Sequence, residues 1–312
     1  MKICFVMTLS ILLGISPAFP VSASDYNTSS LEKMLRGTSG KLLASIAAPD
    51  SPIVAKPLPD VSLEYQSDSF GTSISSELKA PQKPGWYQIA LKQNGAYKVL
   101  EGLRLITLTP FEAKKNGRIG NYFLGLWPFE QQKAISPAYK SPAGFIEVTL
   151  KNINLQISEH FKLSDFVDQD QANVWPKYVA LDTRLVDKLE LIISELNQEG
   201  IGVKHLAIMC GFRSPNSNAT FGDPSGRGKL SRHMFGDAAD IYVDNNKTGW
   251  TQDINHDGRV TLEDVKIIAR AAARVEAKYP NLVGGIGIYP GNGAHGPFIH
   301  IDVRGQAARW NG

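Results

Sequence analysis

The second half of the chain switches between two hydrophobic periods, and this switch restricts the fold more than any other feature of the sequence. After Asp182, a residue type that caps helices, apolar residues recur at the spacing of one helix face: Leu185, Leu189, Ile192, Ile193 and Leu196. Short apolar runs typical of strands follow at 203–209, 240–243, 285–289 and 300–303. Helices mixed with strands in this order predict an α+β domain.

The first residues predict an exported protein. Lys2 precedes an apolar run from Ile3 to Ile15, and Val21-Ser22-Ala23 has the small residues of a cleavage site. The run is shorter than the ~20 apolar residues of a membrane-spanning helix. We therefore expect residues 1–23 to be removed as a signal peptide. The mature chain, without a transmembrane segment, is then periplasmic or secreted.

Composition adds little to this assignment. A net charge of +3 over 312 residues gives no reason to expect nucleic acid as a partner. Cys4 belongs to the signal peptide, so Cys210 has no second cysteine for an internal disulfide. We interpret Cys210 as a small buried apolar side chain at the end of a strand.

Three segments follow the signal peptide. Residues 24–83 are rich in Ser, Pro and Ala and are predicted to be a flexible linker. Residues 84–154 are predicted to form a small β-rich domain, with a hairpin turn at Gln93-Asn94-Gly95. Its aromatic stretch 122–127 is compatible with core packing, an interdomain contact or a ligand platform. Residues 155–312 form the domain in which we expect the chemistry.

Two short segments of this last domain contain residue types that bind zinc. His233 and Asp240 lie seven residues apart with Gly236 between them, so a turn at the glycine can bring both side chains to one ion. His300, on a separate predicted strand, can supply a third ligand. Three protein ligands of this kind are typical of catalytic zinc, although this spacing also fits ordinary loop and strand residues.

The residues around His233 and Asp240 resemble the signature of a known protein family. The segment from Ser231 to Asp240 resembles the S-x-H-x-x-G-x-A-x-D signature of the zinc D-alanyl-D-alanine carboxypeptidase and murein endopeptidase family, which is related to lysostaphin-type peptidases and the hedgehog domain. The segments 284–290 and 298–302 and Arg309-Trp310 look like its periplasmic murein endopeptidase branch. The resemblance implies a catalytic domain with a central antiparallel sheet and a zinc ion on His233, Asp240 and His300.

The same resemblance suggests roles for neighbouring residues. Arg213 matches an arginine of the family's G-[YF]-R-S-P motif and either clamps a substrate carboxylate or oxyanion or forms a structural ion pair. Ser231 either steadies the His233 loop or touches substrate. Asp302, two residues after His300 on the same strand face, is a candidate catalytic residue, which either orients the ligands as a second carboxylate of the site or takes part in proton transfer.

This chain differs from several relatives at the sequence position where they have the general base. They place Glu or Asp three residues before the last histidine, and Pro297 stands there in this chain. His295 is the nearest group able to accept a proton near neutral pH, although it also fits an exposed loop histidine. Without a base, the domain is a zinc-bearing module that does not hydrolyse its ligand.

A calcium-binding pattern is inserted between the zinc ligands. Residues 253–264 match the EF-hand loop D-x-[DN]-x-[DN]-G-x₅-E except at the last position, which is Asp as in dockerin-type loops. The expected calcium ligands are Asp253, Asn255, Asp257, Arg259 through its carbonyl oxygen, and Asp264. We expect a structural calcium ion that holds the insertion beside the active site.

Together these features predict a zinc peptidase that hydrolyses peptide bonds of peptidoglycan, of the murein endopeptidase or the D,D- or L,D-carboxypeptidase type. One alternative is a non-catalytic cell-wall-binding module that carries zinc and calcium. Another is a calcium-dependent adhesion protein. The sequence alone indicates neither the bond that is cleaved nor the oligomeric state.

Overall fold

The computed structural model of the protein describes residues 23–54, 61–67, 71–75, 77–131, 136, 139–225 and 227–312. The predicted signal peptide lies, apart from its last residue, outside the described residues. The described chain contains a smaller hydrophobic core between Leu31 and Leu105 and a larger one that extends to Val303. None of its described helices combines the length and apolar character needed to cross a membrane.

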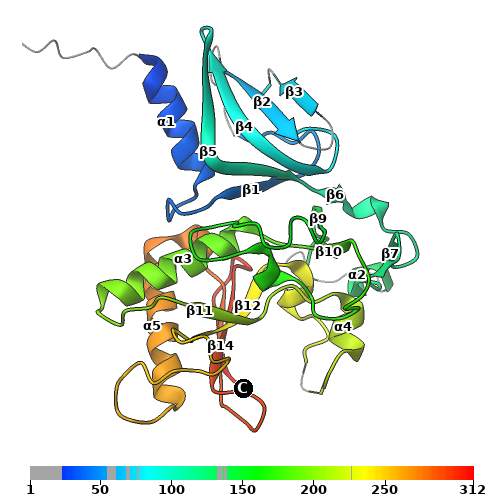
Figure 1. The fold of residues 1–312 in the computed structure, drawn as a ribbon. Helices are drawn as coiled ribbons and strands as arrows, with labels where there is room; N and C mark the ends of the chain where they lie inside the picture. Colours follow the sequence, from blue (N-terminus) through cyan, green and yellow to red (C-terminus); the bar gives the residue numbers. More distant parts are fainter. Residues whose placement is uncertain are drawn as a thin grey trace, which may run out of the picture.

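The smaller unit is a five-stranded sheet with one helix packed against it (Figure 1). The strand order is β1-β5-β4-β2-β3, with β1 parallel to β5 and the other neighbours antiparallel. The predicted hairpin turn is confirmed, because Asn94 and Gly95 both have positive φ between β4 and β5. The elements are α1 (Ala23–Leu35), β1 (Ala44–Ala47), β2 (Val61–Ser67), β3 (Gly71–Ser75), β4 (Gly85–Gln93) and β5 (Ala96–Thr107).

The described part of residues 24–83 is not a linker but a component of this unit, which corrects the predicted domain boundary at residue 84. Val61, Leu63 and Tyr65 alternate with more exposed residues and are buried in the smaller core. The backbone N–H groups of Thr38 and Ser39 donate to the two carboxylate oxygens of Asp187 at 2.7 and 2.8 Å. Pro and Ser interrupt this stretch without removing its strand periodicity, and composition therefore misled the prediction.

The second half contains the predicted α+β arrangement. Its sheet has the order β11-β12-β14-β13-β15, antiparallel throughout except for the parallel pair β13–β15. The helices α3 (Thr183–Gln198) and α5 (Leu262–Lys278) pack against each other, and α5 packs against β13 and β14. The strands are β11 (Leu206–Cys210), β12 (Ala238–Val243), β13 (Gly285–Tyr289), β14 (Phe298–Asp302) and β15 (Ala308–Asn311).

Strand alternation separates the core from the functional face of this sheet. Ile241, Ile299 and Ile301 are fully buried in the larger core. Because successive side chains point to opposite faces, Asp240 and His300 project to the other side. The apolar pattern of the strands therefore aims the predicted zinc ligands away from the core.

Short elements between the two sheets support this functional face. Trp127, from the aromatic stretch, is fully buried and donates from Nε1 to the backbone oxygen of Met234 at 2.9 Å. This agrees with core packing rather than a ligand platform. The remaining elements are β6 (Thr109–Pro110), η1 (Phe111–Ala113), β7 (Arg118–Ile119), β8 (Tyr122–Phe123), α2 (Pro128–Gln131), β9 (Gly144–Val148), η2 (Leu163–Phe166), β10 (Lys177–Val179), α4 (Pro215–Thr220), η3 (Arg232–Phe235) and η4 (Pro280–Leu282).

Candidate metal centre and substrate cleft

Strand register places the site on one row that crosses the whole second sheet. Cys210 on β11 lies opposite Asp240 on β12, which lies opposite His300 on β14. The row continues through Gly287 on β13 to Trp310 on β15. A Cβ atom at Gly287 would lie 2.3 Å from the Trp310 ring, so the glycine makes room for the indole to reach His300, with ring centroids 5.3 Å apart.

His233 reaches this row from η3. The chain leaves η3 at Gly236, whose φ of 73° is left-handed and whose Cβ position is occupied by the backbone oxygen of Ala180 at 2.2 Å. Only glycine fits there, and the chain then turns directly into β12 and Asp240. The predicted turn between the two ligands is therefore confirmed.

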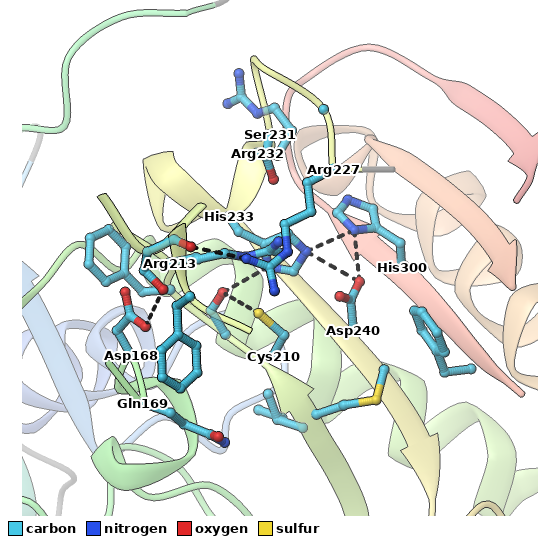
Figure 2. A pocket seen from close by; sticks show the side chains of 18 of the residues that line it. Asp168, Gln169, Cys210, Arg213, Arg227, Ser231, Arg232, His233, Asp240 and His300 are labelled. Carbon is cyan, nitrogen blue, oxygen red and sulfur yellow. Dashed lines mark hydrogen bonds and ion pairs between the residues drawn. The ribbon is translucent and has the colours of Figure 1, made fainter. Parts of the chain in front are cut away.

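Three ligand atoms from these elements form a small triangle (Figure 2). His233 Nε2 lies 3.2 Å from Asp240 Oδ1 and 3.2 Å from His300 Nδ1, and His300 Nδ1 lies 3.0 Å from Asp240 Oδ1. Zinc–nitrogen bonds of 2.0–2.1 Å at tetrahedral angles place neighbouring ligands about 3.3 Å apart. The spacing therefore matches a tetrahedral metal ion.

The outer ring nitrogens determine what the triangle can bind. His233 Nδ1 lies 2.8 Å from the backbone oxygen of Gly211, which can only accept, so Nδ1 donates. His300 Nε2 lies 3.2 Å from Asp302 Oδ2 and donates to that carboxylate. When both rings are neutral, each histidine turns an unprotonated nitrogen toward Asp240 Oδ1. A cation then belongs among these three atoms, either a bound metal ion or a proton on His233.

The electrostatics of the pair lead to the same conclusion. Burial alone lowers the pKa of His233, but the Asp240 carboxylate and, after it, Cys210 outweigh burial and raise that pKa to about 10. Burial raises the pKa of Asp240, and His233 and His300 together hold it well below its ordinary value. The site therefore stabilises a positive charge among these side chains even though they are buried.

Asp302 lies behind the triangle rather than in the cleft. It is fully buried, accepts from the backbone N–H of Gly285 at 2.8 Å, and pairs with Arg304. Burial raises the pKa of Asp302, but the hydrogen bonds with His300 and Arg304 hold it well below its ordinary value, so Asp302 stays ionised and orients His300. Of the two roles that the sequence suggested, the geometry favours positioning over proton transfer.

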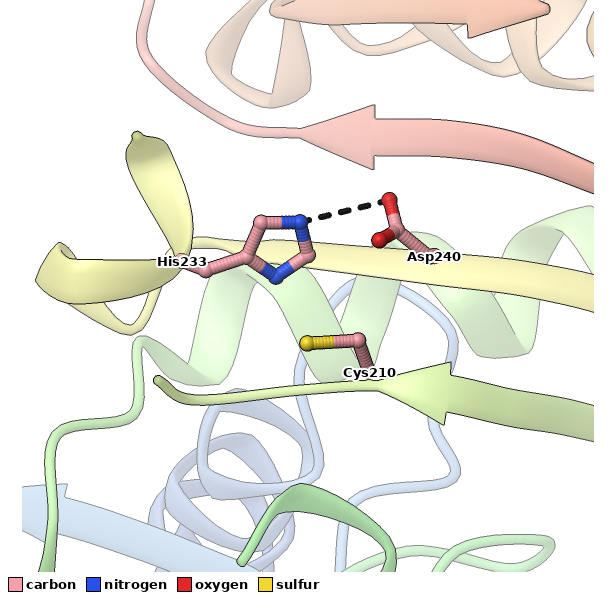
Figure 3. A group of neighbouring side chains, drawn as sticks. All are labelled: Cys210, His233 and Asp240. Carbon is pink, nitrogen blue, oxygen red and sulfur yellow. Dashed lines mark hydrogen bonds and ion pairs between the residues drawn. The ribbon is translucent and has the colours of Figure 1, made fainter. Parts of the chain in front are cut away.

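Cys210 is the site residue that sequence reasoning missed. It is half-buried rather than part of the core, and its ligand atom lies within 4.8 Å of those of His233 and Asp240 (Figure 3). A bulge after Ile208 shifts the register of β11 and brings Cys210 opposite Asp240. Its position directly before the Gly211-Phe212-Arg213 motif was the available signal.

The triangle opens into a cleft of about 950 Å³. Arg213, Ser231 and His295 all line this cleft. Arg213 donates its backbone N–H to the backbone oxygen of His233 at 3.2 Å, which joins the two motifs. Ser231 is the N-cap position of η3, where its side chain makes no capping bond.

His295 lies in the loop between β13 and β14. Its Nδ1 donates to the backbone oxygen of Gly296 at 2.9 Å, and its Nε2 accepts from Asn292 Nδ2 at 3.0 Å. The ring also packs edge-on against Phe298, with ring centroids 5.1 Å apart. The structure thus brings His295 to the cleft wall, where its Nε2 faces Asn292 Nδ2.

Residues 253–264, the predicted calcium loop, form a series of turns closed by side-chain oxygens. Asp253 Oδ2 accepts from Gly258 N at 2.9 Å, Asn255 Oδ1 accepts from Asp257 N at 2.9 Å, and Asp257 Oδ1 accepts from Arg259 N at 2.9 Å. Asp264 is fully buried and accepts from Ile254 N, Asn255 N and Thr261 N at 2.9, 3.3 and 2.8 Å. Asp253 Oδ1 is buried and, within the described residues, has no hydrogen-bond partner.

Comparison with protein families identifies the second half of the chain. A model for the peptidase family M15_2, described as peptidoglycan L,D-endopeptidase MepK, matches residues 132–310. This range is more than half of the chain and contains every residue of the triangle. Comparisons with curated proteins and with solved structures give no match. The chain therefore belongs to the M15_2 peptidase family, described as peptidoglycan L,D-endopeptidase MepK.

Proposed function

We propose that this protein is a zinc-dependent endopeptidase that cleaves a peptide bond in the cross-links of peptidoglycan, outside the cytoplasm. The observation that carries the proposal is the triangle of three acceptor atoms on His233, Asp240 and His300, spaced for tetrahedral zinc. Membership in the M15_2 family supports peptidoglycan as the substrate, and its description supports an endopeptidase. The apolar run 3–15 with its cleavage site supports export.

The roles of the chain's residues follow from their places around the cleft. Bound zinc supplies Lewis acidity that polarises the scissile carbonyl and activates water. Arg213 is joined to His233 through its backbone N–H, and its positive charge in the cleft stabilises the negative charge that develops on the carbonyl oxygen. After its Nε2 breaks the hydrogen bond with Asn292, His295 takes the proton of the attacking water. We assign this role to His295 because position 297 holds a proline and not a carboxylate.

Digestion of purified peptidoglycan tests this function directly. The full chain with zinc should release peptide-linked fragments, and mass spectrometry of these fragments identifies the bond. A chelator of zinc should stop the release, and added zinc should restore it. Binding to peptidoglycan without any released fragment would instead support the cell-wall-binding module. The exposed position of the His295 loop favours this alternative, because an exposed loop histidine need not act as a base.

We also propose that the loop 253–264 binds calcium. The buried, unpartnered Asp253 Oδ1 supports this, as do the turns that leave the side-chain oxygens of Asn255 and Asp257 on the exposed loop. Thr251, just before the loop, donates to the backbone oxygen of Pro297 at 2.6 Å, so the loop is tied to the cleft segment. The ion would thus stabilise the wall that carries His295.

Calorimetric titration of calcium into the chelator-treated chain is expected to show one site. Asp253→Asn and Asp257→Asn should each weaken binding because calcium affinity follows the number of charged ligands. Asp244→Asn, which changes a carboxylate outside the loop, should leave the calcium affinity unchanged. Absence of heat at millimolar calcium would contradict the proposal.

A further inference from the structure

Two arginines beside the triangle have no carboxylate partner. Four arginines line the cleft, and two of them are paired, Arg232 with Asp237 and Arg304 with Asp302. Arg213 and Arg227 form no ion pair with any residue that the structure describes. Figure 2 shows both reaching toward His233 from opposite sides of the cleft.

Arg213 has an unused donor inside the protein. Its Nε is buried, and in the described part of the chain it finds no hydrogen-bond acceptor. A buried donor without a partner costs free energy, most of all when it belongs to a charged group. Such a group in a cleft is explained when a ligand supplies the acceptor.

Arg227 is held in place by helix α4. Its Nη1 donates to the backbone oxygen of Ser217 at 3.0 Å, and Asn218 Nδ2 donates to the backbone oxygen of Gly228 at 3.2 Å. Ser217 Oγ in turn donates to the buried Asp168 at 2.8 Å. The guanidinium is therefore a positioned group with free donors rather than a mobile surface side chain.

The two guanidinium groups are close enough to repel each other. Burial first, and then the positive charge of Arg213, lower the pKa of Arg227. Cys210 first, and then Asp223 and Asp168, offset part of this effect from beyond ion-pair distance. Two cations held together beside a metal site are stabilised by an anion that enters between them.

We propose that Arg213 and Arg227 together bind a free carboxylate of the substrate next to the scissile bond, so that the enzyme selects peptides with this carboxylate over their amidated forms. The planar fork of arginine suits a carboxylate, and two forks occupy all its lone pairs. Arg213 belongs to the zinc-site motif, whereas Arg227 acts in specificity. The proposal rests on the proposed function only for the identity of the peptide.

The test uses two forms of a cross-linked stem-peptide pair from peptidoglycan. The carboxyl group beside the cross-link is free in one form and a carboxamide in the other, and the scissile amide is replaced by a reduced CH₂–NH link. Calorimetry on the full chain with zinc then measures binding without hydrolysis. We expect the wild type to bind the carboxylate form roughly tenfold to a hundredfold more tightly. Arg227→Gln should remove most of this preference, because the carboxylate form loses much more affinity than the carboxamide form.

Lys229→Gln is the matched control, because it removes one positive charge from the same loop at a residue outside the cleft lining. It should keep the preference for the carboxylate. Equal binding of both peptides by the wild type, or an unchanged preference in Arg227→Gln, would overturn the proposal. Hydrolysis of natural peptidoglycan is measured separately, so a chain that discriminates without cleaving would refute the proposed function and not this inference.

Discussion

Replacing His233 with alanine is expected to abolish both zinc binding and hydrolysis of peptidoglycan. The substitution removes one corner of the acceptor triangle and leaves Asp240 and His300 as the remaining pair. Loss of the metal removes several kilocalories per mole of transition-state stabilisation, so activity should fall by at least about 10³-fold. Elemental analysis of the purified chain and fragment release from peptidoglycan measure the two effects.

Two further substitutions distinguish the side chains that bind the metal from those that only lie near it. Asp302→Asn keeps the triangle but weakens the acceptor behind His300, and zinc affinity should fall by roughly tenfold to a hundredfold. Cys210→Ser removes the thiol beside the triangle while all three corners stay, so about one zinc per chain should remain. If Cys210→Ser loses the metal and His300→Ala keeps it, the ligand set is Cys210, His233 and Asp240 instead.

Replacing Glu276 with leucine is expected to destabilise the whole catalytic unit. Lys188 is fully buried on α3 and donates to Glu276 Oε1 on α5 at 2.6 Å and to the backbone oxygen of Asp302 at 2.8 Å. Burial lowers the pKa of Lys188, and Glu276 opposes this effect. Without the carboxylate a buried ammonium group is left unpaired, so the free energy of unfolding should fall by about 3–5 kcal/mol.

Denaturant unfolding of a small series checks this assignment. Lys188→Met combined with Glu276→Leu removes both buried charges, so part of the lost stability should return, although Gly284 N–H and Arg309 still lack their acceptor. Lys266→Met breaks the exposed Lys266–Glu263 pair on the surface of α5 and should change the free energy of unfolding by at most about 0.5 kcal/mol. A Glu276→Leu chain as stable as Lys266→Met would show that the buried pair contributes no net stability.

The hydrophobic periods and helix caps in the second half of the chain were sufficient to predict its secondary structure. The period from Leu185 to Leu196 predicted α3, and the capping of this helix by Asp182 is confirmed by its bond from Arg184 N at 2.9 Å. The runs 240–243 and 285–289 predicted β12 and β13. These predictions succeed because period and caps depend on neighbours in sequence.

The smaller unit could not be predicted in the same way. The parallel pairing of β1 with β5 joins Ala44 to Arg104, sixty residues later, and no local pattern specifies that partner. β2 and β3 lie in a stretch whose Pro and Ser content resembles a linker. The burial of β2 depends on β4 and α1, which supply the facing apolar surface.

The sequence by itself determined the identity of three candidate ligands, because residue type and the glycine at position 236 are local properties. Only the tertiary structure decided what surrounds them. Sheet register put Cys210 beside Asp240, the fold put Asp302 behind His300, and α4 positioned Arg227 in the same cleft as Arg213. Each of these neighbours comes from a different element, and distances between elements are set by packing rather than by spacing along the chain.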